Sequence, residues 1–236
     1  MLRLQNLSTG FPKKTQALHE NVDLLVSPGS LVLLIGPNGI GKSVMLKTLC
    51  GLQSPTHGAV FVNDVNIHKT TAEKRASLTS ILLATPPSID QLSVFDVVIS
   101  GRQRFLSGWN NPSQADQHAV ESATTKTGIA HLTETPFGSL SDGVKQKVML
   151  ARCLAQDSAV ILLDEPLAFL DYPSRISFLE LLKELAQTES KIIVYSSHDL
   201  QLSLNYCGSV MALTHQKWTY FDAPANVNIA EIFPNP

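Results

Sequence analysis

The stretch "LVLLIGPNGIGKS" (residues 31–43) decides the fold of this chain. Its first residues form an apolar run with the length and composition of a buried parallel strand. The remainder matches the pattern G-x-x-x-x-G-K-[S/T], and a helix is predicted to follow from about Gly41 to Gly51. A strand, a glycine-rich loop and a helix in this order predict a phosphate-binding loop in an α/β fold.

The residues of this loop suit a nucleoside triphosphate that is bound together with Mg²⁺. Glycines let the backbone wrap around a phosphate so that its N–H groups point inward. Lys42 would supply positive charge to the β- and γ-phosphates, and Ser43 would offer its hydroxyl to Mg²⁺. The predicted nucleotide-binding residues of the segment are Gly36, Pro37, Asn38, Gly39, Gly41, Lys42, Ser43 and Val44. A chance match has odds of roughly one in a hundred before the flanking strand and helix are counted.

A second apolar run, "AVILLDEP" (159–166), leads into two acids. Its strand would place Asp164 at the carboxyl edge of the sheet, where a carboxylate can hold Mg²⁺ through water. Glu165 would point in a different direction, so one acid could serve the metal while the other polarises a water. Taken alone, two solvated acids before a turn are an equally good interpretation. Beside the phosphate loop, that alternative becomes minor.

A third apolar run, "KIIVYSSHDL" (191–200), places His198 just past another buried strand. At the same sheet edge, its imidazole could hydrogen-bond a γ-phosphate and so detect its presence. The other six histidines have no such position and are interpreted as ordinary surface or partly buried residues. They are His19, His57, His68, His118, His131 and His215.

The rest of the pattern predicts a βα core that is interrupted by helices. Further strands are predicted at residues 2–11, 17–26, 59–63, 81–85 and 209–214, with the turn "FPKKTQ" (11–16) between the first two. Further helices are predicted at residues 93–104, 113–130, 141–156 and 174–190, with the loop "SGWNNP" (107–112) between the first two. The helical insertion therefore covers about residues 86–156.

The composition limits the classes of partner. Charged residues make up 16% of the chain, against about 25% in typical soluble domains, so either the core is large or partners cover part of the surface. A net charge of −2 does not indicate nucleic-acid binding. The apolar runs are too short to span a bilayer, and the first residues lack the apolar stretch of a signal peptide. Three widely spaced cysteines indicate reduced, buried thiols: Cys50, Cys153 and Cys207.

These motifs, in this order, resemble those of the ATP-binding cassette family, in its transporter nucleotide-binding subunits, over essentially the whole chain. "LSDGVKQ" (140–146) resembles the family signature, usually LSGGQ, and "AFLD" (168–171) resembles the D-loop with Asp171. Phe11 stands where the family stacks an aromatic residue on adenine. The resemblance implies one domain, 1–236, with an α/β P-loop NTPase (RecA-like) core and an antiparallel β subdomain. Together these would comprise residues 1–85 and 157–236, with an inserted all-helical signature subdomain at 86–156.

The resemblance also implies a mechanism. Two subunits would pack head to tail as a homodimer around two ATP molecules, with Mg²⁺ near Ser43 and Asp164. Glu165 would polarise the attacking water, Lys42 and His198 would contact the γ-phosphate, and Asp171 would link the two sites. The signature residues would face the γ-phosphate held by the other subunit; they are Leu140, Ser141, Asp142 and Gly143.

Three positions depart from the family pattern. Thr85 stands at the end of the predicted strand 81–85, where the family usually has a Gln that contacts Mg²⁺ and couples to the membrane subunit. Gln91 lies deeper in the following loop and is not expected to compensate. Val144 stands where Gln or Glu is usual, so a capping box with Ser141 cannot form. Val44 replaces a common Thr and is expected to matter little, because Ser43 keeps the metal ligand.

"LSDG", "KQKVMLARCLAQD" and "LAFLD" look most like the ATPases of bacterial importers for iron complexes, haem and cobalamin. This likeness implies transmembrane permease subunits as partners, a solute-binding protein indirectly, no nucleic acid, and a peripheral location on the cytoplasmic face of the inner membrane. One alternative is a soluble cassette ATPase that acts on nucleic acid or ribosomes, or that assembles iron–sulfur clusters. Others are a different P-loop enzyme, such as a small kinase or GTPase, and a pseudo-ATPase that only binds. The sequence lacks an NKxD-type guanine-reading motif, which speaks against a GTPase.

Overall fold

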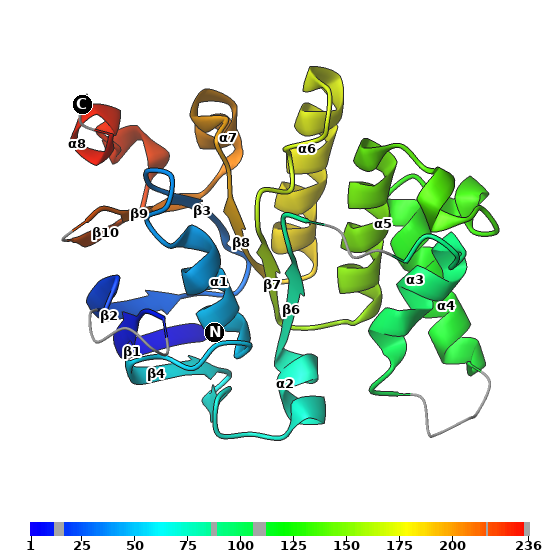
Figure 1. The fold of residues 1–236 in the computed structure, drawn as a ribbon, viewed down its shortest axis with the longest axis horizontal. Helices are drawn as coiled ribbons and strands as arrows, with labels where there is room; N and C mark the ends of the chain where they lie inside the picture. Colours follow the sequence, from blue (N-terminus) through cyan, green and yellow to red (C-terminus); the bar gives the residue numbers. More distant parts are fainter. Residues whose placement is uncertain (12–16, 86–88, 106–111, 216, 234–236) are drawn as a thin grey trace.

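A six-stranded sheet forms the centre of the molecule (Figure 1). The computed structural model describes residues 1–11, 17–85, 89–105, 112–215 and 217–233. Neighbouring strands follow the order β10-β9-β3-β8-β7-β6; β9 to β6 pair in parallel, and β10 pairs with β9 antiparallel. The strands are β3 (Leu31–Ile35), β6 (Thr79–Leu82), β7 (Val160–Leu163), β8 (Ile192–Ser196), β9 (Ser209–Leu213) and β10 (Trp218–Phe221).

Strand β3 is apolar along its whole length because both faces of the sheet are covered. Leu33 and Ile35 point into a buried cluster that includes side chains of α5 and α6. Val32 and Leu34 point the other way, into a cluster with side chains of α1 and the second sheet. Successive strand residues alternate between faces, so a continuous apolar run is what a doubly covered parallel strand requires.

Helices cover the two faces of this sheet (Figure 1). Helix α1 (Lys42–Cys50) lies on one face, and α6 (Tyr172–Thr188) and α7 (Leu200–Tyr206) lie on the other. Gly41 and Gly51 bound α1 with left-handed backbones, which glycine adopts without steric cost. Short helices α2 (Ala72–Leu78) and α8 (Ile229–Ile232) complete this part of the chain. Among the residues that the structure describes, no helix combines the length and apolar character needed to cross a membrane.

A second, antiparallel sheet packs beyond α1, with the strand order β2-β1-β4-β5. Its strands are β1 (Leu2–Thr9), β2 (His19–Val26), β4 (His57–Val62) and β5 (Val65–Asn66). Inward-facing Leu4 and Val60 share the cluster of Met45 and Leu49 from α1. This sheet is the predicted antiparallel part of the fold.

The helices of the insertion gather at one end of the molecule (Figure 1). They are α3 (Val94–Ile99), α4 (Gln114–Lys126) and α5 (Asp142–Ala155). Helices α3 and α4 each begin with a full capping box, formed by Ser93 with Asp96 and by Ser113 with Asp116. Helix α5 differs: its N-cap, Ser141, makes no side-chain capping bond among the described residues. The backbone N–H groups at the start of α5 are therefore left without a cap from that side chain.

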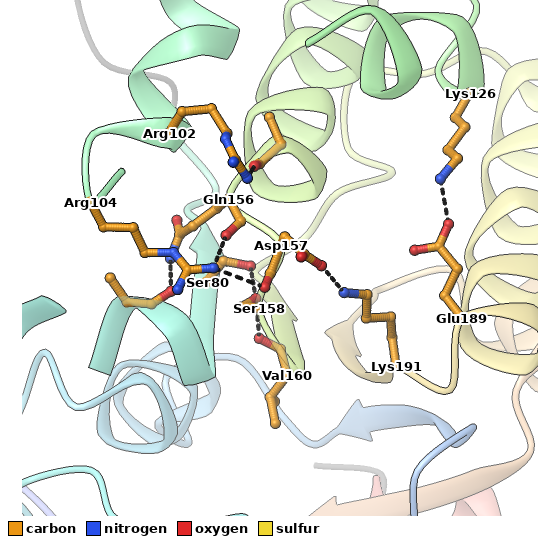
Figure 2. Close-up of polar contacts among 12 residues, drawn as sticks. Ser80, Arg102, Arg104, Lys126, Gln156, Asp157, Ser158, Val160, Glu189 and Lys191 are labelled. Atoms are coloured by element: carbon orange, nitrogen blue, oxygen red, sulfur yellow. Dashed lines mark hydrogen bonds and ion pairs between the residues drawn. The ribbon is translucent and has the colours of Figure 1, made fainter. Parts of the chain in front are cut away.

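Polar contacts join the helical end to the sheet core (Figure 2). The guanidinium of Arg104 donates to the carbonyls of Gln156 and Asp157, at 3.1 and 3.3 Å, just after α5 ends. Lys126, at the end of α4, reaches Glu189 beyond α6 with an Nζ–Oε1 distance of 2.5 Å. These contacts lie where α4, α5 and α6 end, so they tie the insertion to the core at the helix C-termini.

The predicted fold class is confirmed, with local differences. Strand β6 covers residues 79–82 rather than 81–85, so Thr85 lies three residues beyond the strand end. The sequence reading missed α2, and it treated β10 as part of the tail. Residues 12–16 of the predicted turn and 107–111 of the predicted loop lie outside the described part of the chain. The boundaries at 86 and 156 stay a prediction.

Candidate active site

Three loops that carry the predicted site residues meet at one edge of the central sheet. Strand β8 pairs with β3 on one side and β7 on the other, all in parallel. The segments that follow these strands are the glycine-rich loop from Gly36, the Asp164–Glu165 pair, and the turn to His198. Loops after parallel strands share the carboxyl edge, which is where ligands bind in open α/β sheets.

The glycine-rich loop has the backbone of a phosphate cradle. Gly36, Gly39 and Gly41 have φ angles of 153°, 76° and 110°. A Cβ on Gly36 would come within 2.4 Å of the Leu213 carbonyl, and one on Gly41 within 2.8 Å of Leu18 Cδ1. Close packing against backbone therefore excludes a side chain at Gly36, whereas at Gly41 the positive φ is the stronger constraint. None of the described residues would come within 4 Å of a Cβ on Gly39, whose φ of 76° nevertheless favours glycine.

Lys42 lies beneath this loop with its charge partly buried. Its Nζ donates to the carbonyls of Gly36 and Pro37, at 2.8 and 3.3 Å. Burial lowers the pKa of the Lys42 ammonium, while the nearby charges of Glu165 and Asp164 act in the opposite direction. One cation thus lies among loop carbonyls and close to both acids, as a γ-phosphate site requires.

Ser43 and Asp164 supply the oxygen donors that suit Mg²⁺. Ser43 lies in the first turn of α1, directly after Lys42. Asp164 is buried, and its Oδ1 accepts a hydrogen bond of 2.9 Å from the hydroxyl of Ser196. A hydroxyl and a carboxylate match the preference of this hard cation for oxygen ligands, so the residues present fit the metal. Val44, by contrast, is buried in the core, and its carbonyl accepts from Thr48.

Glu165 and His198 lie against each other at the same edge. His198 Nε2 and Glu165 Oε1 are 2.5 Å apart, and both side chains are partly exposed. A carboxylate can only accept, so Nε2 carries the proton in this pair. The Glu165 backbone is left-handed, with a φ of 50°. Its amide donates to the Ser196 hydroxyl at 2.8 Å. Ser196 therefore joins the two acids, and its position at the end of an apolar strand gave no signal of this in the sequence.

The D-loop residue Asp171 is the N-cap of α6, where its carboxylate accepts from the Ser174 amide at 2.9 Å. Hydrogen bonding from the Ser174 hydroxyl, and to a smaller extent from the Ser174 amide, lowers the pKa of Asp171. Arg175, one turn into α6, was not predicted from the sequence. Arg175 donates to the Leu170 carbonyl at 2.9 Å and pairs with Asp199 at 3.2 Å. It ties the D-loop to the turn that carries His198.

Three of the signature residues, Ser141, Asp142 and Gly143, line a hollow of about 430 Å³ that the D-loop completes. Ser141 and Asp142 are exposed there, Leu140 is half-buried, and Val144 occupies the third position of α5 as predicted. A Cβ on Gly143 would lie 3.3 Å from the Phe169 carbonyl, so a small residue is favoured. The first residues of α5 therefore line a concave surface, and their backbone N–H groups receive no cap from the Ser141 side chain.

Comparison with known proteins identifies the family. The model of the ABC transporter family matches residues 19–168. The chain belongs to the ABC transporter family. It is 32% identical over 232 residues to an uncharacterized ABC transporter ATP-binding protein of Methanocaldococcus jannaschii, covering 98% of this chain and 79% of that protein. As an ATP-binding protein of this family, the chain is an ATPase.

The names of two further relatives of this ABC ATPase state a transported substrate. The ferric enterobactin transport ATP-binding protein of Escherichia coli is 33% identical over 98% of this chain and 84% of its own. The achromobactin transport ATP-binding protein of Dickeya dadantii is 35% identical, over 94% of this chain and 82% of its own length. An ABC transporter described as of metal-chelate type, solved in an inward-facing conformation, superposes with a TM-score of 0.86 at 25% identity, over 100% of this chain and 89% of that one.

The remaining predicted residues of this ABC ATPase lie at the margin of the site. Phe11 follows β1 and is 45% exposed. The Leu18 amide donates to the Thr9 carbonyl at 2.7 Å, which brings the hairpin ends together beside Gly41. Thr85 is exposed and lines a groove between the core and the helices. The interpretation of His19 as a surface or partly buried residue is wrong, since it is 4% exposed.

Proposed function

We propose that this ABC ATPase powers uptake of a metal chelate, such as an iron–siderophore, haem or cobalamin complex, through partner permease subunits. It would act as a homodimer around two ATP molecules on the cytoplasmic face of the inner membrane. The observation that carries the proposal is the meeting of the phosphate loop, Asp164, Glu165 and His198 at one sheet edge. The substrate class follows the names of the relatives, which concern ferric enterobactin and achromobactin.

The chemistry assigned to the chain is positioning and electrostatic stabilisation. The loop N–H groups and Lys42 hold the phosphates, and Mg²⁺ held near Ser43 and Asp164 would offset their charge. Glu165 accepts hydrogen bonds at the edge where a water would attack, so its carboxylate can orient that water. His198, hydrogen-bonded to Glu165, can turn its Nε2–H towards the γ-phosphate.

The head-to-tail dimer is supported by the start of α5. Its first N–H groups receive no side-chain cap from Ser141, and they line the concave surface beside the D-loop. A helix N-terminus with free N–H groups attracts an anion. A γ-phosphate held by a second copy would satisfy these groups. Val144 does not prevent this, because the backbone N–H groups of α5, and not the side chain at position 144, would bind the γ-phosphate.

A membrane partner is supported by the groove that Thr85 lines. It has a volume of about 780 Å³ and lies between α2, β6 and the helices α3 and α5. Three leucines on its walls are exposed, Leu52 at 61%, Leu83 at 38% and Leu92 at 42%. Exposed apolar side chains gathered in one groove mark an interaction site. We propose that the permease docks here.

Replacing Glu165 by Gln tests the proposal. The variant should bind ATP with Mg²⁺ as the wild type does, lose at least about a hundredfold in turnover, and accumulate as a dimer at saturating ATP, since the water is no longer polarised. Light scattering coupled to size exclusion gives the mass, and phosphate release gives the rate.

The exposed Glu180→Gln in α6 is the matched control and should behave as wild type. If Glu165→Gln remains a monomer with bound ATP, the dimer is wrong. If it hydrolyses ATP at the wild-type rate, the role of Glu165 is wrong.

A further inference from the structure

We propose that Ser196 is a positioning residue for ATP hydrolysis, because its one hydroxyl holds both acids of the site in place. Ser196 ends β8 and is fully buried. It donates to Asp164 Oδ1 at 2.9 Å and accepts from the Glu165 amide at 2.8 Å. The inference rests on the roles proposed above for Asp164 and Glu165.

The register of the sheet brings these groups together. Leu163 of β7 pairs with Tyr195 of β8, so Asp164, the first residue after β7, lies beside Ser196, the last residue of β8. The amide of Asp164 is held by the Leu82 carbonyl of β6 at 2.8 Å. The carboxylate is therefore anchored through its own backbone on one side and through the Ser196 hydroxyl on the other.

The direction of each hydrogen bond is fixed by chemistry. The Glu165 amide can only donate, so the Ser196 oxygen must accept from it. The hydroxyl proton is then available for Asp164, which as a carboxylate can only accept. This bond engages one lone pair of Asp164 Oδ1 and restrains the rotation of the carboxylate. When Mg²⁺ is bound, the carboxylate would offer its remaining lone pairs to the metal or to a metal-bound water.

The same hydroxyl supports the unusual backbone of Glu165. A left-handed residue with a side chain is sterically disfavoured and persists only where its surroundings hold it. The hydrogen bond from its amide to Ser196 is such a restraint. With this turn fixed, the Glu165 side chain reaches His198 on the neighbouring loop. Loss of the hydroxyl would loosen both the metal acid and the acid that orients water.

The test compares Ser196→Ala with Ser158→Ala. Ser158 is also buried, and its hydroxyl also makes two hydrogen bonds, to Ser80 and to the Val160 carbonyl, but at the opposite end of β7 (Figure 2). Both variants lose a buried hydroxyl of the same kind. We expect Ser196→Ala to lose ten- to a hundredfold in kcat, as supporting groups around metal ligands do, with KM for ATP changed less than about threefold. The Mg²⁺ concentration for half-maximal rate should rise.

Ser158→Ala should lower the melting temperature to a similar extent and leave kcat and the Mg²⁺ dependence unchanged. Ser196→Thr, which keeps the hydroxyl on a strand residue, should restore most of kcat. Equal kcat for Ser196→Ala and Ser158→Ala overturns the proposal. Should the alanine variant not fold, Ser196→Cys decides, because a thiol fills the site but is a weak donor. Wild-type kcat in that variant would overturn the proposal as well.

Glu165→Gln separates this inference from the proposed function. If Glu165→Gln hydrolyses ATP normally, the assigned role of Glu165 fails, whatever Ser196 does. If Glu165→Gln is inactive while Ser196→Ala is fully active, the proposed function stands and only the role of Ser196 fails.

Discussion

His19 gives the protein a stability that depends on pH. It is buried beside the phosphate loop, its Nδ1 lies 2.8 Å from the Thr9 hydroxyl, and burial lowers its pKa to about 4. The pKa of a histidine in the unfolded chain is about 6.5. At pH values between about 6.5 and 4, His19 is therefore protonated in the unfolded chain and neutral in the folded one. Stability is therefore complete above pH 6.5 and falls as the pH drops towards 4.

We expect His19→Asn to flatten this dependence. The wild type should lose about 2 kcal/mol from this histidine between pH 7.5 and 5, and the variant should not. Urea unfolding at both pH values measures the difference. His68 also has a pKa lowered by burial, but it is present in both proteins and cancels. Identical pH slopes for the two proteins would show that His19 titrates normally in the fold.

Thr85→Gln tests the departure from the family pattern. Thr85 lies three residues past β6 and lines the groove, whereas Asp164 is not among the described residues that line it. We expect the substitution to change the ATPase rate of the isolated chain by less than about twofold, because Ser43 and Asp164 already supply metal ligands. A rise of tenfold or more would mean that the missing amide limits turnover.

The sequence predicted the residues whose chemistry is tied to a motif. Lys42, Asp164 and His198 follow apolar strands, and parallel strands had to bring them to one edge. Ser196 and Arg175 were not predictable, because their roles depend on which neighbour a common polar side chain meets in three dimensions. The depth of His19 was missed for the same reason.

At the scale of elements, the ion pair between Arg102 and Asp116 stabilises the helical end. Both residues are buried, and Arg102 Nε donates to Asp116 Oδ1 at 2.9 Å. Arg102 also donates to the Ala155 carbonyl in the last turn of α5 at 3.1 Å. Asp116 in turn completes the capping box of α4 with Ser113. The Asp116 carboxylate therefore joins the start of α4 to Arg102, and Arg102 joins both to the end of α5.

We expect Asp116→Asn to lower the free energy of unfolding by about 3 kcal/mol, because it leaves a buried guanidinium without its counter-charge. Glu121→Gln, on the exposed face of the same helix, is the control and should change stability by less than about 0.5 kcal/mol. Urea unfolding measures both. Equal effects in the two variants would mean that Arg102 finds solvent when its partner is neutral.

Element boundaries were predictable where caps are local. Ser93 with Asp96 and Ser113 with Asp116 have the spacing of capping boxes, and the helices begin there. The predicted position of strand β6 was wrong by two residues at its start. Its first residues, Thr79 and Ser80, are polar yet buried, and hydrophobic patterning cannot detect such residues. Besides α2, which directly precedes them, their environment comes from α1, α5 and the neighbouring strand β7, which are distant in sequence.

At the scale of the whole molecule, the groove predicts membrane association through a partner. In lysates of the native host, we expect Leu92→Asp to lower the ratio of membrane-bound to soluble protein by at least about fivefold. Its basal ATP hydrolysis should be unchanged. Leu92 is 42% exposed, so the fold should tolerate the change. Leu25→Asp on β2, where Leu25 is 57% exposed outside the groove, is the control.

Sedimentation of membranes and blotting of both fractions give the distribution. Unchanged partition of Leu92→Asp, or an equal loss for Leu25→Asp, would contradict docking in this groove.

The overall architecture was accessible from sequence because the sheet divides the core in two. Leu31, Leu33 and Ile35 lie in one cluster, and Val32 and Leu34 in the other. In a chain with a phosphate loop, an apolar run of this length is expected to form a parallel strand that is covered on both faces. Which surface the partners cover could not be predicted, since the leucines of the groove are scattered along the chain.

The left-handed backbone at Glu165 has a consequence for how such a chain evolves. Glycine would adopt that φ freely, whereas a residue with a side chain loses roughly 1 kcal/mol there. In a lineage released from selection for turnover, drift to glycine at this position would cost the fold little while removing the carboxylate. Replacing Glu165 by glycine would therefore relieve the backbone of this turn and remove the carboxylate in a single step.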